Sequence, residues 1–333
     1  MSKLFRPEGM NIELTTCCPL RCPQCYCSLE GGIHIPLKTA VRAIEQAASM
    51  GVRHVELSGG ETLCYPHLYE VIKAASQNGL SPNIAISGWN LSDETLDKLI
   101  EAGIEGIFVS LNAPNPEINA LTRDGYELAI QALELLQRRD YQDRYINWVM
   151  HRSNADLFPE MIALAEQYQV TAISIIAPKP TAAHELKTYP TAEQMYQVAD
   201  QIKRYKGSVQ LFVESCFSPM LALVGRNKFW GNTNRGPYKG CGAGRFSLSV
   251  NVYGQFSPCR HLEYFESWDS MEAYWMESPV LQRLRETEEQ KQEPCRSCSY
   301  GPNCRHCMAY NSKVNHDIYL GSEICPLAQE QVR

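Results

Sequence analysis

Short apolar segments alternate with amphipathic segments through the first half of the chain, and this alternation restricts the fold more than any other feature. Each apolar segment has the length of a β-strand, and the segment after it has the apolar spacing of a helix. The predicted strands cover residues 10–14, 54–58, 83–87, 107–111, 145–150 and 172–176. The predicted helices cover residues 37–50, 67–77, 92–102, 126–138 and 157–168. Such alternation predicts an α/β fold with a parallel sheet wrapped by helices, and right-handed crossovers would curl that sheet into a partial (β/α)6 barrel of the TIM type.

Residues of the types found in metal-binding and cofactor-binding sites follow four of the predicted strands. They are the cysteine-rich loop 17–27, Gly59-Gly60-Glu61, Ser87, and the pair Ser110 and Asn112. In a parallel barrel the carboxyl ends of the strands open at one mouth, where active sites lie. The sequence therefore predicts one functional site built from these four loops.

Composition and charge exclude several classes of protein. The chain has 333 residues, 44% of them hydrophobic, which is enough for one large domain and a smaller one. A formal net charge of -6 gives no electrostatic footprint for nucleic acid. No stretch approaches the roughly twenty apolar residues of a membrane span, and the amino terminus has no signal-peptide core. We therefore expect a soluble, cytoplasmic protein without a membrane partner.

Cysteines are abundant and unevenly placed. Of the fourteen, five lie in residues 17–27, one is Cys64, and eight lie between Cys216 and Cys325. Because the cytosol keeps thiols reduced, metal binding explains this number better than disulfides do.

The first cysteine group, Cys18, Cys22 and Cys25, has the spacing C-x3-C-x2-C on one tight loop. An iron–sulfur cluster is normally held by four cysteinates. A cluster held by three would keep one iron open, as catalytic metal sites keep one position open. The alternative is a zinc site in which Cys17 or Cys27 supplies the fourth ligand.

The second cysteine group lies near the carboxyl end. It contains C-x2-C-x5-C-x2-C over residues 295–307, preceded by Cys241 and Cys259 and followed by Cys325. Residues 246–255 predict a hairpin with its turn near Gly254. A pair of zinc ribbons is the alternative to iron–sulfur clusters here. The predicted organisation is a barrel at 1–205, a bridging region at 206–240 and a cysteine-rich domain at 241–333.

The three-cysteine loop after the first strand and the Gly-Gly-Glu after the second resemble the radical S-adenosylmethionine (radical SAM) superfamily. The resemblance implies a 4Fe-4S cluster on Cys18, Cys22 and Cys25. Its free iron would chelate the amino and carboxylate groups of S-adenosylmethionine, and the reduced cluster would cleave that molecule to a 5′-deoxyadenosyl radical. Gln24 departs from the family, which usually has an aromatic residue there. The cofactor contacts implied are Tyr26, Gly59, Gly60, Glu61, Ser87, Ser110, Asn112 and Arg123.

The carboxy-terminal cysteines resemble the SPASM extension of radical SAM enzymes, with a last spacer of two residues where three are common. The resemblance implies two auxiliary 4Fe-4S clusters and hence three clusters in all. The first would be held by Cys216, Cys241, Cys259 and Cys307, with Cys216 the most variable ligand in the family. The second would be held by Cys295, Cys298, Cys304 and Cys325.

SPASM enzymes mostly modify ribosomally made peptides, so the resemblance implies a precursor peptide as substrate. Residues 58–68, together with Cys25-Tyr26-Cys27, are similar to the spliceases, which excise a tyramine unit from the peptide backbone. Peptide crosslinking through thioether or carbon–carbon bonds and epimerisation are the alternatives. An iron–sulfur electron-transfer or carrier protein is the alternative from another class.

The sequence also leads to expectations about protein partners and about the thiol of Cys64. The first predicted strand begins at about residue 10, which leaves no room for a leader-binding domain, so we expect a separate leader-binding protein. Low-potential clusters also call for a one-electron reductant of the flavodoxin or ferredoxin type. Cys64 lies three residues past Glu61 and is a candidate donor of a hydrogen atom to a substrate radical. A small buried hydrophobe is the alternative reading of Cys64.

Overall fold

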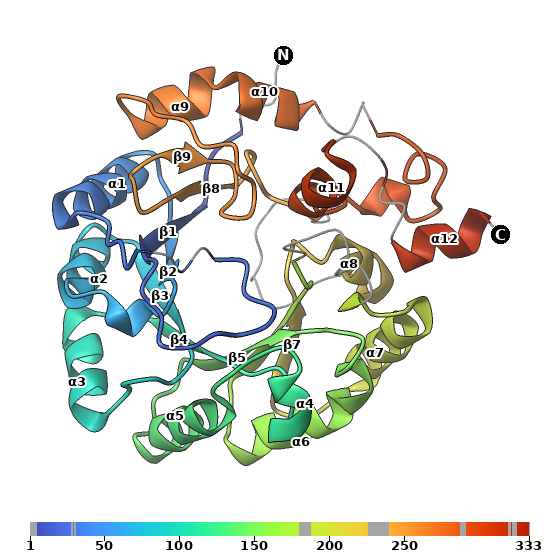
Figure 1. Cartoon of the computed structure of the whole chain (residues 1–333), viewed down its shortest axis with the longest axis horizontal. Coiled ribbons are helices and arrows are strands. Elements are labelled where there is room, and N and C mark those ends of the chain that lie inside the picture. The colour runs from blue at the N-terminus through green and yellow to red at the C-terminus, as the bar shows by residue number, and fades with distance from the viewer. Residues whose placement is uncertain are drawn as a thin grey trace.

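A single sheet of nine strands forms the centre of the computed structural model (Figure 1). The structure describes residues 5–27, 29, 31–179, 188–225, 240–286, 291–318, 321 and 325–332. The strand order is β7-β6-β5-β4-β3-β2-β1-β8-β9, and all neighbours from β7 to β8 pair in parallel. The predicted α/β fold with a curled parallel sheet is therefore confirmed.

All six predicted strands are present within one or two residues of their expected bounds. The strands are β1 Gly9–Thr15, β2 His54–Gly59, β3 Ser81–Ile86, β4 Gly106–Ser110, β5 Arg144–Val149, β6 Ala172–Ile176, β7 Gln210–Val213, β8 Ser247–Val250 and β9 Phe256–Ser257. The sequence reasoning missed β7, which has only four residues. Strand β7 pairs with β6 and extends the arc by one strand.

Helices cover the outer side of the curled sheet in Figure 1. Those of the barrel are α1 Leu37–Ser49, α2 Leu68–Gln77, α3 Asp93–Ala102, α4 Pro116–Ala120, α5 Tyr126–Arg138, α6 Phe158–Gln167, α7 Ala192–Arg204 and α8 Ser218–Val224. Later helices are α9 Met271–Glu277, α10 Pro279–Arg285, α11 Met308–Asn315 and α12 Pro326–Val332. Short 3-10 turns are η1 Thr62–Cys64, η2 Ala155–Leu157 and η4 Gly301–Asn303.

Strand β1 shows how the two faces of the sheet differ. Met10, Ile12 and Leu14 are buried and belong to the main hydrophobic core. Asn11 and Glu13 alternate with them, so they face the opposite side of the sheet. On that inner face Ser58 of β2 donates a 3.1 Å hydrogen bond to Asn11. The barrel therefore has an apolar layer beneath its helices and a polar inner face.

The cysteine-rich region adds to the sheet of the barrel. Strand β8 pairs in parallel with β1, with Gly9 opposite Ser247 and Ile12 opposite Val250. Strand β9 then pairs antiparallel with β8, as the predicted hairpin requires, and Gly254 in the turn has φ +76°. Part of the predicted bridging region, residues 226–239, lies outside the described residues.

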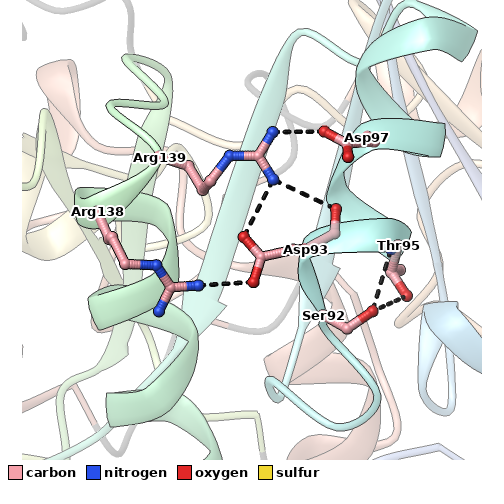
Figure 2. Close-up of polar contacts among 6 residues, drawn as sticks. All are labelled: Ser92, Asp93, Thr95, Asp97, Arg138 and Arg139. Atoms are coloured by element: carbon pink, nitrogen blue, oxygen red, sulfur yellow. Dashed lines mark hydrogen bonds and ion pairs between the residues drawn. The ribbon is translucent and has the colours of Figure 1, made fainter.

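The outer helices α3 and α5 are joined by a cluster of charged side chains (Figure 2). Asp93 accepts from Arg138 at 2.7 Å and from Arg139 at 3.1 Å, and Arg139 also pairs with Asp97. Ser92 caps α3 by accepting a 3.1 Å hydrogen bond from the Thr95 amide. The cluster lies on the solvent side, where ion pairs add little stability. Among the described residues, none of the helices combines the length and apolar character that a membrane span requires.

Candidate active site and metal-binding cysteines

The cysteine loop 17–27 lies across the carboxyl ends of the strands, and the turn after β2 fixes its position. The Gly60 amide donates to the Thr15 carbonyl at 2.7 Å, and the Glu61 amide donates to the Cys17 carbonyl at 2.8 Å. Further along the loop, the Gln24 amide donates to the Thr122 carbonyl at 3.1 Å. The loop is therefore held from both sides by backbone hydrogen bonds.

Both glycines of the turn are required by this close approach. A Cβ on Gly59 would lie 2.3 Å from the Thr15 carbonyl oxygen, and φ there is +150°. A Cβ on Gly60 would lie 2.4 Å from the Cys17 carbonyl oxygen. Sequence reasoning attributed these glycines to an approach of cofactor, whereas the structure already requires them for packing of the cysteine loop.

Glu61 ties the turn after β2 to the end of β3. Its carboxylate accepts hydrogen bonds from the Ser87 amide at 2.8 Å, from the Ser87 hydroxyl, and from the Leu63 amide at 3.2 Å. The side chain is 2% exposed, and burial raises its pKa although these donors oppose the rise. Both oxygens are thus engaged within the chain. Glu61 and Ser87 therefore brace the mouth of the barrel.

The thiols of Cys18, Cys22 and Cys25 lie close enough to influence one another electrostatically. A hydrogen bond with the Cys27 thiol lowers the pKa of Cys25 to about 7. Burial raises the pKa of Cys18. The Cys27 thiol also donates to the Gly59 carbonyl at 3.4 Å. The loop therefore brings three thiols together as potential ligands. Cys27 lies beside them and, through its hydrogen bond, favours the thiolate form of Cys25.

Arg123 brings a positive charge to this group. Its charge acts on both Cys18 and Glu61. Its backbone carbonyl accepts from the Asn119 amide group at 2.8 Å, which fixes the segment before α5. The Arg123 Nε is buried, and no described residue accepts a hydrogen bond from it. A buried donor without an acceptor beside three thiols fits a site that receives an anionic group.

Ser110 and Asn112 occupy the end of β4 as expected, but the Asn112 amide is fully used within the chain. Its Nδ2 donates to the Thr122 hydroxyl at 2.9 Å, and its Oδ1 accepts from the Val149 amide at 3.1 Å. Ser110 is half-buried and pairs with Asn147 of β5. Of these two residues, Ser110 is the better placed to meet a ligand.

Cys64 ends the 3-10 turn η1, next to Glu61, and its thiol hydrogen-bonds to that of Cys17. Burial, followed by the nearby Cys17, raises the pKa of Cys64 to about 12. The thiol therefore stays protonated at neutral pH. It is half-buried, at the same mouth as the three-cysteine loop.

The structure brings the first predicted auxiliary set together. Charge interactions link Cys259 to Cys241 and Cys307, and Cys216 to Cys307. Burial is the largest influence on all four and raises their pKa values, to about 12 for Cys259. Lys179, just beyond β6, opposes this rise at Cys216 by its charge and a hydrogen bond.

The second predicted auxiliary set is also gathered. Cys304 interacts with Cys295, Cys298 and Cys325. Burial raises the pKa of Cys325 to about 11. The ammonium of Lys291 donates to the carbonyls of Gly301 at 2.6 Å and Cys304 at 2.7 Å, which braces the loop. A pocket of about 600 Å³, which includes open solvent, is lined by all four cysteines of this second set, by Cys216 and Cys307 of the first set, and by Tyr189 and Tyr310.

These donor sets suit a thiolate-bound cluster in their chemistry. Buried thiols gathered in groups are neutral until a metal takes them as thiolates, and soft sulfur ligands favour iron–sulfur clusters or zinc. All fourteen cysteines are free thiols. No group of three or more His, Cys, Asp or Glu side chains among the described residues is arranged to hold a metal ion. The sulfur atoms are thus neighbours without converging on one point.

Two basic residues beside the candidate ligands were not singled out from the sequence. Lys179 follows β6 and reaches the first auxiliary set, and Arg260 follows Cys259 and contacts the ring of Tyr26 at 4.9 Å. Tyr26 itself is 38% exposed. A basic residue next to a candidate ligand, or directly after a barrel strand, is the signal that would have found them.

Comparison with known proteins shows what this chain is similar to. Residues 12–165 match the profile of the radical SAM superfamily. The chain is 28% identical to a PqqA peptide cyclase of Methylocella silvestris, over 98% of this chain and 90% of that protein. It is also 28% identical to the mycofactocin maturase MftC of Mycolicibacterium smegmatis, over 92% and 79%.

Solved structures share the fold. SuiB of Streptococcus suis bound to S-adenosylmethionine superposes with a TM-score of 0.76 at 18% identity, over 96% of this chain and 77% of that one. The structure of SuiB bound to its precursor peptide SuiA gives a TM-score of 0.75 over 97% and 76% at 18% identity.

Proposed function

We propose that this chain, whose residues 12–165 match the radical SAM superfamily profile, is a radical SAM enzyme that modifies a ribosomally made precursor peptide. The observation that carries the proposal is the mouth of the barrel, where the Gly59-Gly60-Glu61 turn holds a loop with three neighbouring thiols. Relatives named for peptide cyclisation and peptide maturation along nearly the whole chain support a peptide substrate. The structural neighbour SuiB, solved with a precursor peptide, has the same fold.

An iron–sulfur cluster on Cys18, Cys22 and Cys25, together with S-adenosylmethionine, would supply one-electron chemistry that removes a hydrogen atom from an unreactive carbon. The protein's part is to hold these groups and exclude competing reactions. The loop is rigid because its backbone is bonded to the turn after β2. The pKa of Cys25, lowered to about 7 by its hydrogen bond with Cys27, eases the loss of the proton that metal binding requires.

The residues around the loop would receive S-adenosylmethionine. Arg123, whose Nε lacks an acceptor among the described residues, is the proposed partner of the carboxylate. Ser110 and the exposed face of Tyr26 would contact the nucleoside part, while Gly59 and Gly60 offer backbone groups. Asn112, Glu61 and Ser87 would act by fixing the strand ends, since their side chains are engaged within the chain.

For the reaction itself we propose backbone splicing with loss of a tyrosine-derived tyramine unit, based on the sequence similarity of residues 58–68. Crosslinking and epimerisation are the competing outcomes. Epimerisation needs a hydrogen atom returned to the carbon radical, and the protonated Cys64 at the mouth would supply it. Cys64 therefore separates the outcomes: an epimerase requires its S–H bond, and a splicease does not.

The auxiliary sets would hold two further 4Fe-4S clusters, one on Cys216, Cys241, Cys259 and Cys307 and one on Cys295, Cys298, Cys304 and Cys325. A flavodoxin or ferredoxin-type protein would supply electrons, and a separate protein would bind the leader of the precursor. Tight leader binding by this chain alone in a pull-down would contradict the separate partner.

The test begins with anaerobically reconstituted protein. It should bind about twelve irons, by the arithmetic of three four-iron clusters, and release 5′-deoxyadenosine from S-adenosylmethionine once reduced. Replacing Cys18, Cys22 and Cys25 by Ala should abolish release and remove one cluster only. Intact clusters without release in the unaltered protein would favour the electron carrier.

Co-expression with candidate precursor peptides identifies the reaction by mass. Loss of a tyramine-sized fragment indicates splicing, loss of two hydrogens a crosslink, and no change in mass epimerisation. Cys64→Ala should leave splicing intact and should stop epimerisation at the radical stage. Cys64→Ser, which keeps the size but not the weak S–H bond, is the matched control.

A further inference from the structure

Residues 26–27 of the three-cysteine loop touch residues 260–261 of the cysteine-rich region, although Cys27 and Arg260 are 233 positions apart. The Arg260 Nη2 donates to the Cys27 sulfur at 3.5 Å. The Arg260 guanidinium lies 4.9 Å from the centre of the Tyr26 ring. The other side of this contact is His261, whose ring centre lies 4.2 Å from that of Tyr26 at an interplanar angle of 66°.

Both touching segments directly follow candidate metal ligands. Cys27 shares a hydrogen bond with Cys25, the last ligand candidate of the radical SAM loop. On the other side, the His261 amide donates to the sulfur of Cys259 at 3.5 Å. A chain of contacts thus runs from Cys25 through Cys27 and Arg260 to Cys259, and Arg260 is its centre.

The surroundings of Arg260 keep its charge in place. The side chain is held against the inner face of the barrel, where Glu13 of β1 and Glu56 of β2 interact with its charge. These two carboxylates lie on the same face of the sheet because Asn11 is paired with Glu56 and Ser58 with Glu13. The cation is therefore fixed between the two metal sites by groups from three parts of the chain.

We propose that Arg260 is a positioning residue that holds the radical SAM loop against the first auxiliary site and makes the reduced clusters on both sides easier to form. This inference rests on the proposed function in that it assumes clusters at both places. Reduction adds a negative charge to a cluster, and a fixed nearby cation favours that added charge. The planar guanidinium also stacks on Tyr26 while it donates to Cys27, which an ammonium cannot do in the same geometry.

The charge and the shape of Arg260 can be tested separately in the reconstituted holoenzyme. Arg260→Gln removes the charge, and Arg260→Lys keeps the charge without the planar group. Redox titration followed by electron paramagnetic resonance should show more negative potentials for the radical SAM and first auxiliary clusters in Arg260→Gln. The second auxiliary cluster, held by other cysteines, should not change. Arg260→Lys should restore most of the shift.

Arg204→Gln is the matched control for loss of an arginine charge. Arg204 is 80% exposed on α7 and pairs only with its helix neighbour Asp200 at 2.9 Å among the ion pairs described. Its replacement should leave all three potentials unchanged. Unchanged potentials in Arg260→Gln with full iron content would overturn the electrostatic role.

Hydrogen exchange of the metal-free protein tests the positioning role without any cofactor. Residues 17–27 should exchange faster in both Arg260 variants than in the unaltered chain, because both lose the stacked contact with Tyr26. Equal exchange in all three proteins would overturn the positioning role. This measurement stands even if Arg260→Gln fails to retain iron.

The outcome also separates this inference from the proposed function. If the unaltered protein binds clusters but does not cleave S-adenosylmethionine, the proposed function fails, while the potentials and exchange rates still decide the role of Arg260. If cleavage occurs and neither measurement responds to Arg260, only the role of Arg260 fails. With both intact, Arg260→Gln should also cleave more S-adenosylmethionine per modified peptide than the unaltered enzyme.

Discussion

The barrel and the cysteine-rich region share one sheet but are stabilised differently. In the barrel, strands β1 to β6 bury large apolar side chains beneath helices of up to thirteen residues. In the cysteine-rich region, helices α9 and α10 have seven residues each, and the four thiols of each set are gathered without a disulfide. Helices so short are not stable alone. The comparison predicts that the barrel folds through its core, whereas the four-cysteine loops of the later region become ordered by binding a metal.

Removal of metal is the strongest way to separate the two regions. Replacing Cys295, Cys298, Cys304 and Cys325 by Ala should leave residues 291–332 unprotected in hydrogen exchange, because ligand binding energy is folding energy in such sites. Strands β1 to β6 should remain protected to within about twofold, on the general independence of local unfolding units. The matched control is Cys17→Ala, outside both auxiliary sets. Equal loss of protection in the barrel would show that the two regions fold as one unit.

Replacing a glycine at the mouth of the barrel should have the next largest effect, on cluster binding. Gly60→Ala places a Cβ 2.4 Å from the Cys17 carbonyl, so the cysteine loop must move. We expect loss of the radical SAM cluster, with both auxiliary clusters retained, when iron is counted after reconstitution. Gly9→Ala on β1 is the control, since its Cβ would meet nothing nearer than 4.0 Å. Retention of three clusters in Gly60→Ala would mean that the loop adapts.

The buried carboxyl group of Glu61 should make the free energy of unfolding of the barrel depend on pH. Burial raises its pKa above the ordinary 4.5, so in the pH window between the ordinary and the raised pKa the folded protein binds more protons than the unfolded chain. The contribution of Glu61 to stability is therefore largest in acid and falls as the pH rises through the raised pKa. Glu61→Gln replaces one of the two acceptor oxygens by an NH2 group that faces a donor from Ser87 or Leu63, and should cost about 1–3 kcal/mol near pH 4.

The measurement is the free energy of unfolding of the two proteins in urea from pH 4 to pH 8. The difference between them should shrink with rising pH. A difference that grows with pH would mean that the folded protein favours the ionised carboxylate. Ser87→Ala, which leaves Glu61 titratable, should keep the pH trend and lose the two hydrogen bonds of the Ser87 hydroxyl, with Glu61 and with the Trp89 amide.

The same two regions differ in how far sequence alone predicted them. Apolar spacing predicted the barrel strands because strands such as β1 and β6 bury apolar side chains against the helices. The glycines and cysteines lie at the mouth of the barrel, as expected. Pairing of β8 with β1 was not predicted, because register between distant segments leaves no local signal. The hydrogen bond that Asn112 accepts from Val149 and the contact of Arg260 with Cys27 were missed for the same reason, since both join residues distant in the chain.

The outer helices of the barrel provide the smallest expected effect. Asp93 and Asp97 of α3 share Arg139, the residue after the end of α5, and all three are exposed to solvent (Figure 2). Arg139→Gln should change the urea midpoint by less than any variant above, because water and salt already screen these charges. Any effect should vanish in molar salt. Arg204→Gln, which breaks an isolated pair with Asp200, is the control for a single contact.

A loss in Arg139→Gln comparable to that of Glu61→Gln would contradict this ranking, because it would make the outer ion cluster as important as a buried carboxylate. If Arg139→Gln lowers the urea midpoint more than Arg204→Gln does, and salt abolishes this difference, the difference measures how much an arginine shared by two aspartates adds over a single ion pair. The barrel would then owe its stability to the apolar layer beneath the helices and little to the charges that cover them. The cysteine-rich region adds buried side chains such as Tyr274 and Trp275 to the same core, and its buried cysteine variants should respond to iron content rather than to salt.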